Sequence, residues 1–108
     1  MDDKIIYAKA IEVGGADLQF RMSIEECLEM ALAICHLYRG RADTSNLAEE
    51  VADVEIMCGQ VRLMIGDDIV DKAKKRKLEK LWCRIHDNKM VNQEGTEGKW
   101  PTNLNQDD

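Results

Sequence analysis

The sequence predicts an all-α fold, arranged as a four-helix-type bundle. Apolar residues recur at three- and four-residue intervals over long stretches, and no alternating run is bounded by turn residues as a strand would be. The only proline, Pro101, lies near the end of the chain. A length of 108 residues suits one domain. We expect residues 1–87 to form this helical domain and the polar residues 88–108 to form a C-terminal tail.

Glycines and capping residues divide the helical region into four segments. Glycines follow the first three segments, where they are typical stop signals. Ser45 or Asn46 can cap the third helix, and Asp67 or Asp68 can cap the fourth. The expected helices span residues 3–13, 16–38, 45–65 and 67–87.

The charge balance and the termini narrow the class of protein. The net charge is −6, and such an acidic chain makes nucleic-acid binding unlikely as a general role. No apolar run approaches the roughly 18–20 residues that span a bilayer. The N-terminus opens with two acids and lacks the basic end of a signal peptide. The default expectation is a soluble cytoplasmic protein that is not bound to membranes.

Four cysteines occur, at positions 27, 35, 58 and 83. None forms a C-x-x-C pair, so neither a zinc site nor a thioredoxin-type site is indicated. They lie in phase with apolar residues, where free cysteine behaves as a small hydrophobic side chain. We therefore expect four packed, free thiols.

The second and third helices carry the clearest apolar patterns. On the third helix the apolar line is Leu47, Val51, Val54, Cys58, Val61 and Ile65. On the second helix one stripe is Phe20, Ile24, Leu28, Ala31, Cys35 and Tyr38. Nearly opposite lies a stripe of Met22, Glu26, Glu29, Ala33 and His36. A helix that is apolar on two sides is usually central in a bundle or shared with another subunit. Glu26 and Glu29 are therefore expected to face another helix.

Two carboxylate pairs, Glu26-x-x-Glu29 and Glu50-x-x-Asp53, form the candidate site. Residues three apart share a helix face, and a short loop predicts antiparallel packing of the two helices. Four converging carboxylates would repel one another, and hard cations such as Mg²⁺ or Mn²⁺ would remove that repulsion. Solvated acidic faces explain such pairs about equally well. A di-iron site is disfavoured because neither pair contains histidine.

The segment from Ile24 to Val61 resembles the MazG-like all-α nucleoside triphosphate pyrophosphohydrolases. That family has an E-x-x-E, a gap of some twenty residues and an E-x-x-D. The surroundings also match, with EEC-x-E, then RG, then N-L-A-E-E-x-A-D-V. The resemblance covers about residues 15–87. One departure is Leu28, where many relatives have a small residue, which bears on helix packing.

The resemblance implies hydrolysis of nucleoside triphosphates to a monophosphate and pyrophosphate. Glu26, Glu29, Glu50 and Asp53 would hold Mg²⁺, or Mn²⁺, and act in catalysis. The residues that would contact the substrate are Gln19, Arg39 of the RG element and Lys77. Relatives of this kind are homodimers or homotetramers, so we expect a homo-oligomer with sites near the subunit interface.

Several alternatives remain open. One alternative is a phosphoribosyl-ATP pyrophosphohydrolase, an activity that occurs on the same fold. Another is a non-catalytic helical interaction module, in which the acidic residues are only surface charge. The basic run Lys72–Lys80 could approach the triphosphate, touch nucleic acid or simply be a solvated helix face. Trp82 lies on an apolar stripe with Leu78 and Ile85, so it is expected in a core or an interface.

Overall fold

The structure, a computed structural model, describes residues 1–41 and 43–87. These residues form four helices and no strand, which confirms the all-α class. The helices are α1 (Asp3–Gly14), α2 (Ala16–Tyr38), α3 (Thr44–Ile65) and α4 (Asp67–His86). The expected tail, residues 88–108, lies outside the described part of the chain. Residues 1–65 form one compact unit, and α4 belongs to a second unit.

A capping aspartate precedes helix α1, and a glycine with positive φ follows it. The side chain of Asp2 accepts a hydrogen bond from the backbone N–H of Lys4 at 3.1 Å, and Asp3 places negative charge in the first turn. At the other end, Gly15 has a φ of 86°, a conformation that favours glycine. The chain therefore turns sharply between α1 and α2.

The helix caps differ from those predicted. Helix α3 begins at Thr44, because the Asp43 carboxylate accepts the backbone N–H of Asn46 at 2.9 Å. Neither Ser45 nor Asn46 is the cap, since Asp43 stands earlier and starts the helix sooner. Helix α4 has Gly66 at its N-cap position, with a φ of 118° and no side-chain hydrogen bond. The expected caps of α4, Asp67 and Asp68, instead lie in its first turn, where their charge favours the helix dipole.

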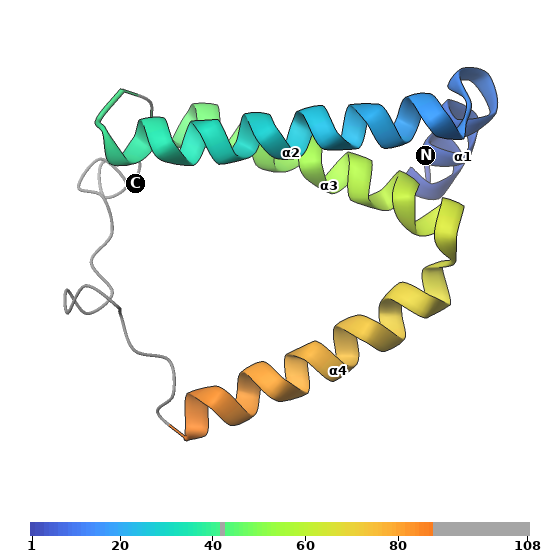
Figure 1. The fold of residues 1–108 in the computed structure, drawn as a ribbon. Helices are drawn as coiled ribbons and strands as arrows, with labels where there is room; N and C mark the ends of the chain where they lie inside the picture. Colours follow the sequence, from blue (N-terminus) through green and yellow to red (C-terminus); the bar gives the residue numbers. More distant parts are fainter. Residues whose placement is uncertain (42, 88–108) are drawn as a thin grey trace. The chain divides into compact units, whose positions relative to one another are not determined.

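Helices α2 and α3 form an antiparallel pair within the first unit (Figure 1). The side of α2 that is buried or half-buried is the inner seam, which runs Gln19, Ser23, Glu26, Met30, Ala33 and Leu37. The matching line on α3 runs Leu47, Glu50, Val54, Met57, Val61 and Met64. Both lines repeat every three and four residues, the spacing of paired helices.

Helix α1 packs against one end of this pair and contacts both α2 and α3. The Tyr7 ring lies against Gly59, where any Cβ would overlap the ring. The buried side chain of Gln19 donates from Nε2 to the carbonyl oxygen of Ala10 at 3.2 Å. A glycine and a buried amide thus hold α1 in place.

Two of the predicted apolar patterns are wrong in detail. On α3, Leu47, Val54 and Val61 are half-buried as predicted, but Val51, Cys58 and Ile65 are exposed. The packed line is rotated toward Met57 and Gln60, because α3 meets α2 and α1 on that side. On α2, the whole stripe from Phe20 to Tyr38 is exposed in the chain.

The four cysteines are free thiols, but all four are exposed rather than packed. Cys27, Cys35 and Cys58 lie on helices with buried residues, whereas α4, the helix of Cys83, has none. Exposure on the single chain therefore corrects the expectation that these residues fill a core.

Candidate metal centre

Three of the four predicted carboxylates come together between α2 and α3. One oxygen from each of Glu26, Glu29 and Glu50 lies within 4.8 Å of the others. The three-residue spacing on α2 places Glu26 and Glu29 on neighbouring turns, and the antiparallel packing brings Glu50 across from them. The predicted convergence of the two pairs is thus seen in three of its four members.

The cluster is half-enclosed rather than fully solvated. Glu26 and Glu50 belong to the buried lines of their helices, whereas Glu29 is exposed. Oε2 of Glu26 and Oε2 of Glu50 are buried without a hydrogen-bond partner in the described part of the chain. Buried carboxylate oxygens normally have a partner, so these two atoms are free to accept one from outside the chain.

The cluster raises the pKa of two of its members. For Glu26, desolvation is the largest cause of the raised pKa, followed by repulsion from Glu29 and from Asp53. For Glu50, desolvation again comes first, and repulsion from Glu29 and Asp53 follows in raising the pKa. A carboxylate surrounded by like charge holds its proton to a higher pH than an isolated one.

Asp53 lies outside the closest group. Its carboxylate is exposed and does not join the 4.8 Å cluster. Its charge nevertheless contributes to the raised pKa of Glu26 and of Glu50. Asp53 is therefore near enough for its charge to act on Glu26 and Glu50, but it is not one of the three converging carboxylates.

The donor set suits a hard divalent cation. Three carboxylates offer oxygen ligands, and no imidazole or thiolate belongs to the group. Mg²⁺ and Mn²⁺ favour such ligands and usually keep several bound waters. The two unpartnered oxygens of Glu26 and Glu50 fit this requirement, because a cation would both pair them and cancel their mutual repulsion.

The other three predicted contact residues differ in their surroundings. Gln19 is buried at the junction of α1 and α2, where its amide is bound to Ala10. Arg39 is exposed and follows the last residue of α2. Lys77 is exposed on α4, in the second unit.

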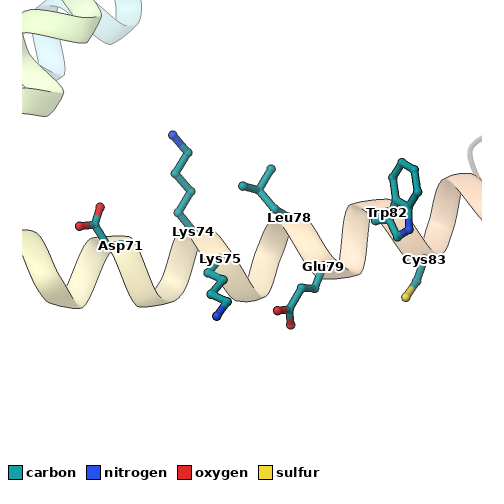
Figure 2. Close-up of a pocket in the computed structure, with 7 residues that line it drawn as sticks. All are labelled: Asp71, Lys74, Lys75, Leu78, Glu79, Trp82 and Cys83. Atoms are coloured by element: carbon teal, nitrogen blue, oxygen red, sulfur yellow. The ribbon is translucent and has the colours of Figure 1, made fainter.

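Helix α4 is an amphipathic basic helix. Seven basic residues and one acidic residue lie between Lys72 and His86. Figure 2 shows Lys74, Leu78 and Trp82 pointing to one side, and Lys75, Glu79 and Cys83 to the other. Trp82 is 63% exposed and its ring lies 4.2 Å from that of His86, centroid to centroid. Trp82 is therefore not buried among the described residues, and its predicted place in an interface stays a prediction.

Sequence reasoning did not single out Gln60. Its side chain is 6% exposed, and Oε1 has no hydrogen-bond partner in the described residues. The signal was available, because Gln60 lies on the same side of α3 as Glu50 and Met57. Like Glu50, Gln60 is a polar side chain on the packed side of α3, where most side chains are apolar.

Comparisons with models of protein families, with curated proteins and with solved structures find no match to this chain. None of the described helices has the length and apolar character needed to cross a membrane.

Proposed function

We propose that the chain is a Mg²⁺-dependent nucleoside triphosphate pyrophosphohydrolase of the MazG-like all-α type. The observation that carries the proposal is the convergence of Glu26, Glu29 and Glu50, with two buried oxygens that have no partner in the described chain. The motif resemblance of Glu26-x-x-Glu29 and Glu50-x-x-Asp53 supports the same reaction. Mn²⁺ is an alternative cation, because the ligand set suits both.

The proposed chemistry follows from charge. A bound divalent cation would neutralise part of the triphosphate charge and stabilise the charge that develops at the attacked phosphorus. Glu26, Glu29 and Glu50 would hold the cation between the two helices. A carboxylate of this group that is not engaged as a ligand would accept the proton of the attacking water. The raised pKa of Glu26 and of Glu50 suits that role, because a stronger base takes the proton more readily.

The substrate would need cations besides the metal. Arg39 and Lys77 are exposed basic residues, and guanidinium or ammonium groups bind phosphate oxygens well. We assign them as candidate phosphate contacts. Gln19 is a weaker candidate, since its amide is already bound to Ala10.

The proposal includes assembly into a homodimer or homotetramer. Only three apolar side chains are buried in the described residues, namely Ala33, Leu37 and Met57. Many large apolar side chains of α2 and α4 are exposed instead. Exposed apolar surface of this extent is typical of an interaction site.

The test is pyrophosphate release from a panel of ribo- and deoxyribonucleoside triphosphates, with and without Mg²⁺. We expect metal-dependent release by the wild type. Glu50→Gln should lower the rate by about 10²–10⁴-fold, the range lost when an acid–base group is removed. Glu55→Gln is the matched control, because Glu55 is an exposed glutamate of the same helix outside the cluster.

Two results would contradict the proposal. One is the absence of release from any triphosphate by a folded protein whose melting temperature does not respond to Mg²⁺. That result would favour a non-catalytic interaction module. The other is an equal loss of activity in Glu50→Gln and Glu55→Gln, which would separate the activity from the cluster.

A further inference from the structure

Helix α4 carries a continuous ridge of basic side chains. The basic ridge consists of Lys72, Arg76, Lys80 and Arg84, which follow one another at intervals of four residues. Side chains four apart are neighbours on a helix surface, so the four cations lie within about 120° of arc. At 1.5 Å per residue the ridge is about 18 Å long. Its positive charge is therefore spread along a line rather than gathered at one point.

The acids of α4 do not neutralise the basic ridge. All four of its side chains are exposed among the described residues, and none of them forms an ion pair with an aspartate or glutamate of the helix. Glu79 is the only acid between Lys72 and Arg84. It lies at one edge, about 80° around the helix from the middle of the ridge. The charge of the ridge is thus available to an anion from outside the helix.

The apolar side of α4 lies opposite the basic ridge. Its apolar line consists of Leu78, Leu81, Trp82 and Ile85, and the middle of this line is about 170° around the helix from the middle of the ridge. Figure 2 shows Leu78 and Trp82 pointing to the same side of the helix. A helix that packs turns its apolar side to its neighbour and leaves its charged side to water. The ridge therefore stays accessible whichever surface covers the apolar line.

The acidity of the whole chain resides outside this stretch of α4. Residues 1–65 contain twelve acidic and six basic residues, a net charge of −6. Residues 72–86 contain one acidic and seven basic residues, a net charge of +6. The total charge of the chain argues against nucleic-acid binding as a general role, but it does not describe this helix. A local cluster of cations on one helix is the electrostatic footprint of a phosphate-binding surface.

We propose that the basic ridge of α4 binds the phosphate backbone of a nucleic acid with little regard to sequence. A row of separate cations about 18 Å long suits a polymer of phosphates, because a single triphosphate would reach only part of it. Helix α4 contains no Asn or Gln, the side chains that read adenine in the major groove. The proposal does not depend on nucleotide hydrolysis by the carboxylate cluster.

An anionic membrane is the alternative polyanion. A basic amphipathic helix that binds a bilayer inserts its apolar side at the level of the headgroups. Inserting the apolar line of α4 would turn the opposite ridge toward water, away from the lipid phosphates. The position of the ridge therefore favours nucleic acid.

The first experiment measures binding of the full chain to a short fluorescent DNA duplex by anisotropy, at several salt concentrations. A chelator removes divalent cations that could bridge carboxylates to phosphates. Each cation on a phosphate contributes about −0.9 to the slope of log K against log salt, so the four cations predict a slope of about −3.6. Affinity should fall about 150-fold between about 50 and 200 mM salt. Duplex RNA and a single strand distinguish the kind of nucleic acid, and a second duplex of different sequence should bind within about threefold.

The second experiment removes three of the four ridge cations with Arg76→Gln/Lys80→Gln/Arg84→Gln. The slope should become shallower by about 2.7, and affinity in about 50 mM salt should fall about tenfold or more. Arg76→Lys/Arg84→Lys, which keeps both charges, should retain the slope.

A matched control variant removes the same numbers of arginines and lysines from exposed positions in residues 1–65. It is Lys9→Gln/Arg21→Gln/Arg41→Gln. Its affinity should stay within about threefold of the wild type, because none of these charges lies on the ridge. Circular dichroism should show the helices retained in both triple variants, since glutamine is a good helix former.

Four outcomes would overturn the proposal. No binding by the wild type in about 50 mM salt would show that the ridge is only a solvated helix face. Equal losses in the ridge variant and the control variant would assign binding to total charge. An unchanged slope in the ridge variant would place the contacts on another surface. Binding to vesicles of phosphatidylserine and phosphatidylcholine, with none to nucleic acid, would assign the helix to a membrane surface.

Discussion

Helix α2 has two lines of side chains that differ in burial and in polarity, and polar residues occur on the more buried of the two. The inner seam is buried or half-buried and includes Gln19, Ser23 and Glu26, three polar residues among six. A second line on α2, the outer seam, is exposed among the described residues and contains no charged side chain; it consists of Phe20, Ile24, Cys27, Ala31, Ile34 and Tyr38. Three polar side chains of α2 thus lie on the side that packs against α3, whereas an uncharged line of the same helix is exposed among the described residues. The inner seam is where a cation can be held, and the outer seam is where another helix can pack.

The buried side of the α2–α3 pair holds both carboxylates, which are costly to enclose, and apolar side chains, which stabilise the packing. Glu26 and Glu50 are enclosed by their positions in the α2–α3 pair, and their charges are left unpaired within the described chain. Leu37 in the same pair is buried to 4% exposure and stabilises the packing. The cost of enclosing the carboxylates is tolerable when a cation binds there.

The largest expected difference between the seams is in stability. Leu37→Ala on the inner seam should lower the free energy of unfolding by about 2–5 kcal/mol, because it leaves a cavity. Leu28→Ala beside the outer seam should cost no more than about 0.5 kcal/mol in dilute protein, since an exposed side chain loses little. Urea denaturation at two protein concentrations measures both.

The dependence on protein concentration should differ between the Leu37→Ala and Leu28→Ala variants. The cost of Leu37→Ala should be the same at both concentrations, because its contacts are within one chain. The cost of Leu28→Ala should appear only at the higher concentration, where dimers form. Equal costs for the two variants in dilute protein would mean that the outer side of α2 is already covered in the monomer.

Cation binding at the carboxylate cluster of the inner seam should stabilise the folded chain. At about 100 times its Kd, Mg²⁺ or Mn²⁺ should add about 2.7 kcal/mol, which raises the melting temperature by about 10–20 °C. Glu26→Gln should abolish most of this rise. Glu25→Gln, at the neighbouring exposed glutamate, should retain it. A rise of the same size in both variants would indicate nonspecific binding of cations to an acidic protein.

The two buried glutamines separate a partnered polar group from an unpartnered one. Gln19→Met should cost about 1–3 kcal/mol, because it removes the hydrogen bond from the buried Gln19 amide to the carbonyl oxygen of Ala10. Gln60→Met should change stability by less than about 1 kcal/mol, because Oε1 of Gln60 has no partner in the described residues to lose. Thermal denaturation compares them directly. A large loss for Gln60→Met would reveal a partner of this side chain.

The smallest expected effect is the pH dependence of the metal-free protein. Because the pKa of Glu26 and of Glu50 is raised above the ordinary 4.5, the folded state binds their protons more tightly than the unfolded state does. Their contribution to stability is fully present below pH 4.5 and is lost as the pH rises through the raised values.

The measurement is the free energy of unfolding of the wild type and of Glu26→Gln/Glu50→Gln in a chelator, from about pH 4 to pH 8. The double variant should gain on the wild type as the pH rises through this window. A constant difference across the range would show that the two carboxylates do not repel one another in the folded state.

Much of the local structure followed from the pattern of residues. The all-α class and the four helices were predicted to within a few residues at each end, because glycines and three- and four-residue periodicity act locally. The convergence of Glu26, Glu29 and Glu50 was also predicted, since spacing on two antiparallel helices places them opposite one another. The caps at Asp43 and Gly66 were missed, because several capping residues stood in a row.

The sequence alone determined which residues share a helix face and which faces are apolar, because a helix has a fixed geometry. It could not determine which of two apolar faces on α2 turns inward. The tertiary structure decided this: α3 and α1 pack against the side of Ala33 and Leu37, and the line from Phe20 to Tyr38 stays exposed. The same rotation put Glu50 in the buried line and left Asp53 outside it. Periodicity fixes angles around one axis, whereas the choice among faces depends on the combined packing of all helices.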